Sequence, residues 1–396
     1  MRDTDVVIVG AGAAGLSLAH RLCAPDAGAR PLAVALVDAP PGPHPPQERT
    51  WCFWEAPGGE FDQALTASWD RLRVYGPGGA ETVGRPAPLR YKMLRSGDFA
   101  SVVGARLAGQ RTVIRTEATV ESVRDVATGA EVRGRDAAGR PVTLRARWAF
   151  DSRPGPRLPP ARTTLRQHFR GWFVRTRRPV FDPAVADLMD FRVPQPPHGL
   201  AFGYVLPLTD RTALVEYTQF SRRPLETADY ERALAHYTAH VRKLGPFDIT
   251  AVEQGAIPMT DGRFPRRVGR SVFRIGTAGG ATRPSTGYTF AAVQRQSDAI
   301  ATALRLHRPP LPPPAHTRWA RALDAVLLRA LDSGRVDGAA FFGGLFGAVP
   351  MERLLRFLDG RSRLWEDLTI GLRTPVLPML RTVAELPLLP RRSAPW

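Results

Sequence analysis

The sequence is poor in cysteine and lysine, and it has no long uninterrupted apolar run. Cys23 and Cys52 are its only cysteines, too few for a disulfide framework and without the spacing of a metal site. We therefore predict no metal centre and a reducing, cytoplasmic location, and the acidic start of the chain does not fit a signal peptide. Without about 18 consecutive apolar residues no spanning helix is expected, so any membrane contact should be peripheral.

Positive charge comes almost wholly from arginine, because Lys92 and Lys243 are the only lysines. Basic residues outnumber acidic ones by 55 to 37, which gives a formal net charge of +18. Two interpretations fit this excess: a diffusely basic surface, or a surface that settles on anionic lipid. Nucleic acid is the least favoured partner, since no basic block interleaved with aromatic residues and no nucleic-acid motif is present.

The beginning of the chain organises the rest. Residues 6–9 form an apolar, β-branched run that predicts a buried strand, and residues 16–22 have the apolar spacing of a helix. A glycine-rich turn separates the two, and a second apolar strand is expected over residues 32–37. This order of strand, glycine turn, helix and strand predicts a Rossmann-like site for a dinucleotide.

Each glycine of the turn has its own role in this motif. Gly10 allows the tight turn, Gly12 lets the backbone approach a pyrophosphate, and Gly15 lets helix and strand pack closely. The pyrophosphate would lie at the helix N-terminus, where free N–H groups and the helix dipole favour negative charge. Asp38 ends the second strand, where it can accept hydrogen bonds from a ribose. The predicted contacts in this part of the chain are Gly10, Gly12, Ala13, Ala14, Gly15 and Asp38.

A second glycine-rich turn follows a strand expected over residues 271–275 and precedes a helix expected over residues 288–306. Two such turns more than 200 residues apart fit FAD better than NAD. Arg95, near another helix start, either reaches a phosphate or forms a surface salt bridge. The contacts predicted in addition to the first set are Arg95, Gly276, Gly279, Gly280, Gly287 and Tyr288.

The middle of the chain has the aromatic-rich, alternating segments of an antiparallel sheet, and the end is mostly helical. We predict an α/β fold with a Rossmann-like FAD-binding domain, a mixed or antiparallel substrate-binding sheet and a helical C-terminal region. The FAD-binding domain is expected to be discontinuous, with its second part returning after the substrate-binding domain. The expected boundaries are 1–151 and 269–307 for the FAD-binding domain, 152–268 for the substrate-binding domain, and 308–396 for a C-terminal cap.

Two apolar segments have two interpretations each. Trp51, Phe53 and Trp54 either close a hydrophobic core or form the wall of a substrate pocket. Residues 339–349 are wholly apolar but too short to cross a bilayer, so they predict a buried loop or helix, or else a lipid-facing tunnel mouth. The leucine- and proline-rich tail over residues 375–390 is a candidate for the same membrane-facing surface.

Several short motifs, taken in order, resemble the FAD-dependent lycopene cyclases of bacteria and plants, particularly the bacterial β-cyclases. They run along nearly the whole chain and include residues 49–53, 167–171, 188–191, 204–208, 214–218, 253–259, 278–288, 341–346 and 375–378. The resemblance implies that the substrate is lycopene, that β-rings close at its ψ-ends, and that no net redox change occurs. It also implies that reduced FAD is needed without being consumed, with NADPH or NADH as its reductant.

Glu216 matches the acidic position that this family needs for activity. Related members often carry a second acid directly after it, where this sequence has Tyr217. Because side chains alternate along a strand, Leu214, Glu216 and Thr218 should share one face and Tyr217 should lie on the other. A buried glutamate keeps its proton near neutral pH, so Glu216 is predicted to be the general acid that protonates the terminal alkene, or to hold that acid in place.

The remaining interpretations are a flavin-dependent monooxygenase or prenyl reductase, and a carrier without enzymatic activity. The first two would consume reduced nicotinamide in proportion to product, whereas a cyclase product has the mass of lycopene. A carrier would return lycopene unchanged and gives no reason for an acid at Glu216. The oligomeric state is not predictable from the sequence.

Overall fold

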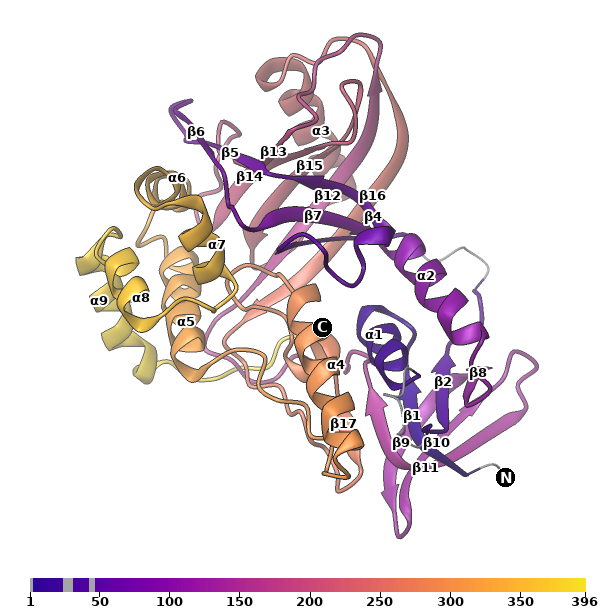
Figure 1. Cartoon of the computed structure of the whole chain (residues 1–396). Coiled ribbons are helices and arrows are strands. Elements are labelled where there is room, and N and C mark those ends of the chain that lie inside the picture. The colour runs from indigo at the N-terminus through magenta and orange to yellow at the C-terminus, as the bar shows by residue number, and fades with distance from the viewer. Residues whose placement is uncertain (1–2, 24–30, 43–46) are drawn as a thin grey trace.

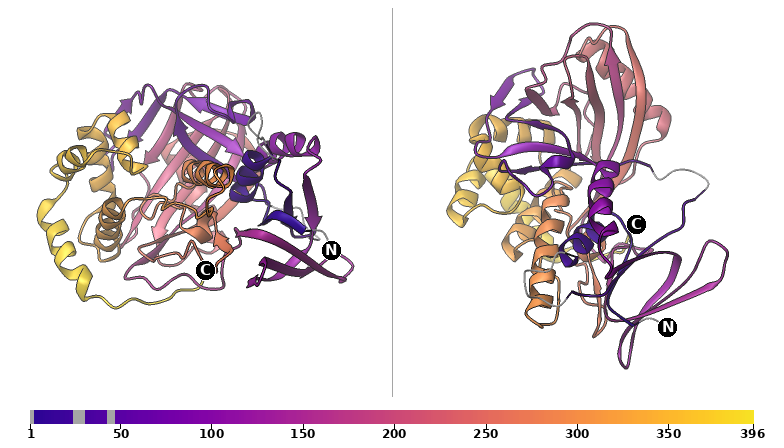
Figure 2. Two further views of the ribbon diagram at one scale, coloured as in Figure 1. Left: turned by 60° about the horizontal axis from the view of Figure 1, so that its bottom comes forward. Right: turned by 45° about the vertical axis from the view of Figure 1, so that its right-hand side comes forward.

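The computed structural model describes residues 3–23, 31–42 and 47–396, and within them the strands form three sheets (Figure 1). The first sheet holds the dinucleotide motif, the second is made mostly by the middle of the chain, and the third is small. The C-terminal helices lie on the side of the molecule away from the first sheet (Figures 1 and 2). The fold is therefore the predicted α/β arrangement with a helical C-terminal region.

The first sheet is centred on β1 (Asp3–Val9), whose apolar residues are buried as in other parallel strands covered on both faces. The strand order is β8-β2-β1-β11-β10-β9, and β17 pairs with β11. Pairing is parallel from β1 to β2, from β1 to β11 and from β11 to β17, so the chain returns to this sheet after the second sheet. The other strands are β2 (Val34–Asp38), β8 (Val113–Glu117), β9 (Thr119–Val126), β10 (Gly129–Arg135), β11 (Pro141–Asp151) and β17 (Val272–Arg274).

Helices α1 (Ala13–Leu22) and α4 (Phe290–Arg305) pack against each other beside this sheet, and α2 (Ser96–Ala108) packs next to α1. Their buried faces share one apolar cluster with residues of β1, β2 and β17. Thus helices from the beginning and from the last third of the chain pack together beside the first sheet.

The second sheet has the order β16-β12-β15-β14-β13-β5-β6 and is antiparallel except where β13 pairs with β5. Helix α3 (Thr227–His236), continued by a π-helical turn (Tyr237–Val241), covers one face. Buried side chains fill both faces of the central strands, which explains their high aromatic content. The strands are β5 (Arg71–Tyr75), β6 (Glu81–Gly84), β12 (Thr164–Thr176), β13 (Val185–Asp190), β14 (Leu200–Pro207), β15 (Thr212–Ser221) and β16 (Phe247–Thr260).

The other face of the second sheet is covered by the third sheet and the C-terminal helices, which share one large apolar cluster with it. The third sheet has the order β3-β7-β4 and lies across the second in Figure 1. Its strands are β3 (Thr50–Glu55), β4 (Leu65–Trp69) and β7 (Arg90–Arg95). The helices are α5 (Arg318–Asp332), α6 (Gly338–Ala348), α7 (Met351–Leu358), α8 (Leu364–Gly371) and α9 (Val376–Glu385).

Two expectations differ from the structure, and the structure decides one alternative that the sequence left open. Residues 71–84 fall within the predicted first domain, but their strands β5 and β6 belong to the second sheet, because β5 pairs with β13. The helix expected from residue 288 begins at Phe290, so Tyr288 remains in the preceding turn. The apolar segment 339–349 is the helix α6, whose Phe342, Leu345 and Phe346 are buried in the large cluster, so it is a core helix.

Candidate active site

The first glycine turn has the geometry of a dinucleotide-binding turn. A Cβ on Gly15 would lie 1.8 Å from the carbonyl oxygen of Gly10, so only glycine permits this approach of helix to strand. A Cβ on Gly12 would meet nothing within 4 Å, which leaves the space in front of α1 open. Gly12 is the N-cap of α1, and neither a side-chain cap nor an acidic residue occupies the first turn. The free N–H groups of this helix end are therefore available to an anion.

Asp38 lies beside this turn, at the end of β2, where its Oδ1 accepts a hydrogen bond from the Ala11 N–H at 3.1 Å. Ala13 and Ala14 form the first turn of α1. The predicted contacts of the N-terminal set therefore lie together, around the open space at the start of α1.

The late glycine turn joins this site to the second sheet. A Cβ on Gly276 would lie 2.8 Å from the Cβ of Ala14, so the two glycine turns are in contact. Gly279 and Gly280 end the short 3₁₀ helix that starts at Gly276. A Cβ on Gly287 would lie 2.4 Å from Gln167 Oε1 on β12. That buried amide oxygen has no hydrogen-bond partner among the residues that the structure describes, so it is available to a donor on a bound cofactor.

Arg95 is the last residue of β7 and the N-cap of α2. Its guanidinium forms an ion pair with Glu48 and lies 5.0 Å from the ring centroid of Phe173 on β12. Arg95 therefore lies next to the second sheet and forms a salt bridge. A salt bridge was the alternative to a phosphate contact that the sequence left open.

Four residues from adjacent strands form a row across the second sheet, which we call the cross-sheet row: Glu253, Gly171, Glu216 and Tyr204. Gly171 is in register with Glu253 on one side and with Glu216 on the other, and Glu216 is in register with Tyr204. Residues in one row point to the same face. This is the face covered by the third sheet, since Leu214 and Phe173, the next pair along the strands, lie in the large apolar cluster.

Glu216 is buried in this row and keeps its proton at neutral pH. Burial raises the pKa of its carboxyl to about 8; a hydrogen bond from Thr218 opposes the rise, and the nearby Glu253 adds to it. Thr218 Oγ1 donates to Glu216 Oε1 at 2.5 Å. As predicted from the alternation of β15, Tyr217 lies on the opposite face, among the residues under α3. Tyr217 therefore cannot act beside Glu216 as a second acid.

Three tyrosine hydroxyl groups lie next to the cross-sheet row. The Tyr91 hydroxyl is hydrogen-bonded to that of Tyr204 at 2.6 Å and to that of Tyr288 at 2.9 Å. Cys52 packs beside them, and burial raises the pKa of its thiol to about 12. Burial also raises the pKa values of all three tyrosines. The cluster is thus neutral and acts through hydrogen bonds and ring faces.

The aromatic residues of β3 are divided between two cores. Trp54 packs edge-on against Tyr288, with ring centroids 4.5 Å apart, on the side of the tyrosine cluster. Trp51 and Phe53 point the other way, toward Phe290 of α4, at centroid distances of 5.7 Å and 4.7 Å. Because side chains alternate along a strand, of these three predicted substrate contacts only Trp54 faces the side that holds Glu216.

Glu253, Tyr91 and Tyr204 are the neighbours of Glu216 that the sequence did not single out. Glu253 and Tyr204 do occur in motifs that resemble those of lycopene cyclases, and this is the sequence feature that could have identified them. Glu253 and Tyr204 are close to Glu216 because β16, β12, β15 and β14 pair in this register. The register between distant segments cannot be predicted from the sequence of any single strand.

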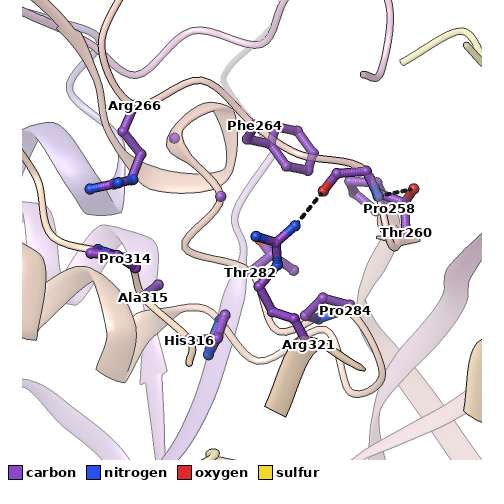
Figure 3. Close-up of a pocket in the computed structure, with 13 residues that line it drawn as sticks. Pro258, Thr260, Phe264, Arg266, Thr282, Pro284, Pro314, Ala315, His316 and Arg321 are labelled. Carbon is purple, nitrogen blue, oxygen red and sulfur yellow. Dashed lines mark hydrogen bonds between the residues drawn. The ribbon is translucent and has the colours of Figure 1, made fainter. Parts of the chain in front are cut away.

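Two pockets lie away from Glu216. The first, of about 60 Å³, lies against the late glycine turn and is lined by residues that include Gly279, Gly280, His316 and Arg321. Figure 3 shows His316 and Arg321 in its lining. The second, of about 470 Å³, lies at the β14–β15 turn among charged residues that include Arg175, Arg211 and Asp248. The charged lining of the second does not suit a hydrocarbon.

The C-terminal helices α8 and α9 carry an exposed apolar surface, which we call the α8–α9 face. Six of its side chains are between 50% and 74% exposed: Leu364, Leu368, Leu372, Leu377, Leu380 and Val383. Exposed arginines lie among them in the sequence, at positions 361, 363, 373 and 381. Exposed apolar side chains with cationic residues close to them in the sequence are typical of an interaction site.

Within residues 3–23, 31–42 and 47–396, no helix is both long and apolar enough to cross a bilayer. The same part of the chain holds no cluster of three or more histidine, cysteine and acidic side chains suited to a metal ion. Both cysteines are free.

Comparison with known proteins places the chain in a family and identifies its fold. The family model described as lycopene cyclase protein matches residues 5–384, nearly the whole chain. A search of curated proteins found no match.

Among solved structures, a geranylgeranyl bacteriochlorophyll reductase-like protein from Thermoplasma acidophilum has a TM-score of 0.61 at 12% identity, over 98% of this chain and 100% of that one. A flavoprotein/dehydrogenase from Cytophaga hutchinsonii has a TM-score of 0.63 at 12% identity, over 97% and 99%. A p-nitrophenol 4-monooxygenase from Pseudomonas putida has a TM-score of 0.59 at 15% identity, over 97% and 98%. At these identities the likeness shows a shared fold, that of a flavoprotein.

Proposed function

Because this chain belongs to the lycopene cyclase protein family, we propose that it is a lycopene β-cyclase that closes the ψ-ends of lycopene into β-rings without net redox change. The observation that carries the proposal is Glu216, a protonated carboxyl buried on an apolar sheet face beside the late glycine turn. A hydrocarbon substrate offers no hydrogen-bonding group, so an apolar wall with one acid suits it.

Glu216 supplies the proton that starts the reaction. Its carboxyl gives H⁺ to C2 of the terminal C1=C2 alkene, which leaves a cation at C1. The C5=C6 electron pair then forms the C1–C6 bond, and loss of the C6 proton restores a C5=C6 double bond. An alkene is a weak base, so the acid must be protonated and dry when the substrate arrives, and burial meets both needs.

The two glycine turns are the proposed FAD site, and their residues fit this group. The open space at Gly12 and the uncapped start of α1 suit a pyrophosphate, Asp38 suits a ribose, and the unpaired Gln167 Oε1 suits a ring donor. Bound in its reduced form, FAD would supply negative charge near the cation in a low-dielectric site. The contact between Gly287 and Gln167 brings this site to the face that carries Glu216.

Aromatic side chains of this chain would add to the stabilisation of the cation. Trp54 and Tyr288, packed together beside the cross-sheet row, are the proposed contacts, each contributing about 0.5–2 kcal/mol by cation–π attraction. Trp51 and Phe53 instead support the packing of β3 on α4. Their contribution is therefore to the fold of the dinucleotide-binding domain.

The α8–α9 face is the proposed contact with the membrane, from which lycopene would be taken. Its exposed leucines can enter the lipid headgroup region while the neighbouring arginines bind anionic lipid. The protein would then be cytoplasmic and attached peripherally to the membrane.

The proposal is tested by anaerobic incubation of the FAD-loaded protein with lycopene in liposomes, after photoreduction or with NADPH or NADH as reductant. Chromatography with mass analysis should give one-ring and two-ring products with the mass of lycopene. The Glu216→Gln variant, which keeps size and FAD binding but not the acid, should give none. Unchanged lycopene with the native protein would contradict the proposal, as would turnover by Glu216→Gln at the native rate.

The same experiment identifies the alternative activities. Nicotinamide consumed in proportion to product, with a product heavier than lycopene by oxygen or by two hydrogens, would indicate a monooxygenase or a prenyl reductase. Turnover by strictly oxidised protein without reductant would remove the proposed role of the reduced cofactor.

A further inference from the structure

A second buried carboxyl, that of Glu253, lies in the cross-sheet row with Glu216. Glu216 on β15 and Glu253 on β16 both pair with Gly171 of β12, the strand between them. Their Cα atoms are therefore two strand spacings, about 10 Å, apart, and their side chains leave the same face of the sheet. Gly171 puts no side chain between them. A Cβ there would lie 2.8 Å from Leu214 Cδ1 and 3.4 Å from Glu216 Cβ. The row thus carries two carboxyls on one face, one on each side of Gly171, and the Leu214 and Glu216 side chains pack over the glycine.

The two carboxyls are held differently. Both oxygens of Glu253 accept a hydrogen bond from Thr50, Oε1 from its N–H at 2.8 Å and Oε2 from its hydroxyl at 2.6 Å. Burial raises the pKa of Glu253, and these donors, together with the nearby Arg95, oppose the rise. Donors on both oxygens of Glu253 favour its ionised form, whereas Glu216 accepts one hydrogen bond, from Thr218, and burial raises its pKa to about 8. Such a difference separates an acid from a base.

From this geometry we propose, resting on the cyclase function above, that Glu253 is the proton acceptor of ring closure, the partner across the sheet of the acid Glu216. Glu216 gives its proton to C2, the C5=C6 pair forms the C1–C6 bond, and Glu253 takes the proton from C6. The C6–H electron pair restores C5=C6. The ring is an isomer of the open end, and the proton returns from Glu253 to Glu216 before the next closure, so no oxidant or reductant is consumed.

The spacing of the row fits this division of roles. C2 and C6 of the forming ring are both bonded to C1, so they lie about 2.5 Å apart. Acid and base each need to come within about 3 Å of their carbon, so the two carboxyls should be separated by about 9 Å. Side chains that leave Cα atoms about 10 Å apart can reach this separation. The cross-sheet pair therefore supplies the second carboxyl that the sequence lacks at Tyr217.

Glu253 also ties β16 to β3 through Thr50, so the test must separate proton transfer from anchoring. The position of the ring double bond does this. After ring closure the cation at C5 can lose a proton from C6, from C4 or from its methyl group, and only loss from C6 gives a β-ring. A positioned base selects C6, whereas an anchor changes the rate alone.

The experiment compares Glu253→Gln, Glu253→Asp and Thr50→Val, each loaded with reduced FAD and given lycopene in liposomes. Glu253→Gln should lower kcat by about 10²–10⁴-fold and yield rings with C4=C5 or exocyclic double bonds, identified by NMR. Glu253→Asp keeps a carboxylate on a shorter side chain and should keep the β-ring as its main product. Thr50→Val loses one anchoring hydrogen bond and should lower the rate less, with the β-ring as its sole product.

Two outcomes would overturn the proposal. One is a Glu253→Gln variant that gives only β-rings at the native rate, and the other is equal loss of rate in Glu253→Gln and Thr50→Val without a change in ring type. Retained FAD and native thermal unfolding identify a folded variant. If Glu253→Gln does not fold, the Glu253→Asp variant decides: some rings with C4=C5 or exocyclic double bonds beside the β-ring would support a base that must reach C6, whereas β-rings alone at the rate of Thr50→Val would refute it. Unchanged lycopene with the native protein would instead refute the cyclase function itself.

Discussion

Replacing Glu216 by glutamine should change the pH dependence of stability, apart from any effect on activity. The pKa of this carboxyl is about 8 in the folded protein, against an ordinary value of 4.5 in the unfolded chain. Below pH 4.5 the group is protonated in both states. As pH rises from 4.5 to 8 the unfolded chain releases the proton and the folded protein keeps it, so unfolding becomes more favourable.

The magnitude follows from the two pKa values. Each unit of difference corresponds to about 1.4 kcal/mol, so the native protein should lose about 5 kcal/mol of unfolding free energy between pH 4.5 and 8 through this group. Above pH 8 both states are ionised and the loss is complete. Glutamine has the same size and does not titrate, so Glu216→Gln should lack this loss.

The measurement is denaturant unfolding of the native protein and of Glu216→Gln at a series of pH values. Titrating groups other than Glu253, whose charge is coupled to Glu216, affect both proteins equally, so the difference between the two unfolding free energies reports Glu216 and this coupling. This difference should grow in favour of the variant by about 1.4 kcal/mol per pH unit between pH 4.5 and 8 and then stay constant. A difference that stays constant over the whole range would refute the assignment of a buried, protonated Glu216.

Further predictions concern the cofactor turn, a buried thiol and the α8–α9 face. Gly12→Ala should leave the stability of the cofactor-free protein within about 0.5 kcal/mol but weaken FAD binding tenfold or more, measured by flavin fluorescence, because its Cβ enters only the pyrophosphate space. Gly15→Val should cost about 3 kcal/mol in thermal or denaturant unfolding, because its Cβ would overlap the Gly10 carbonyl. Cys52 should resist iodoacetamide in the folded protein and react after unfolding, since burial raises the pKa of its thiol to about 12; rapid labelling of the native protein would contradict its burial. The double change of Leu377 and Leu380 to aspartate should reduce co-sedimentation with anionic vesicles, whereas aspartate at Val268, an exposed apolar position outside this face, should not.

Much of the architecture could be predicted from local sequence patterns. The strand at the N-terminus, the return of residues 146–151 to its sheet and the hairpin across residues 201–220 are confirmed. The family resemblance is confirmed as well. Each depends on a feature of short segments: continuous apolar runs for parallel strands, alternation for antiparallel ones, and glycines where helix and strand must approach closely.

The same local rule placed Glu216 and Tyr217 on opposite faces of β15, because alternation needs no information from elsewhere in the chain. It could not place Trp51, Phe53 and Trp54. Alternation predicts that neighbouring side chains lie on opposite faces of the strand, but it does not predict which face is on the side of Glu216. Packing on Phe290 decided that two of them belong to the other core.

The sequence by itself determined the dinucleotide motif and the opposite faces of Glu216 and Tyr217, because each depends on one short segment, and it determined the family, because the family's motifs follow in order along the chain. Three features are known only from the tertiary structure. Gly276 lies against Ala14, and residues 71–84 belong to the second sheet. Glu253 lies in the same row as Glu216. These are pairings between segments far apart in the chain. They are settled by which register buries the most apolar surface while leaving every backbone group hydrogen-bonded, a property of the whole sheet and of no single strand.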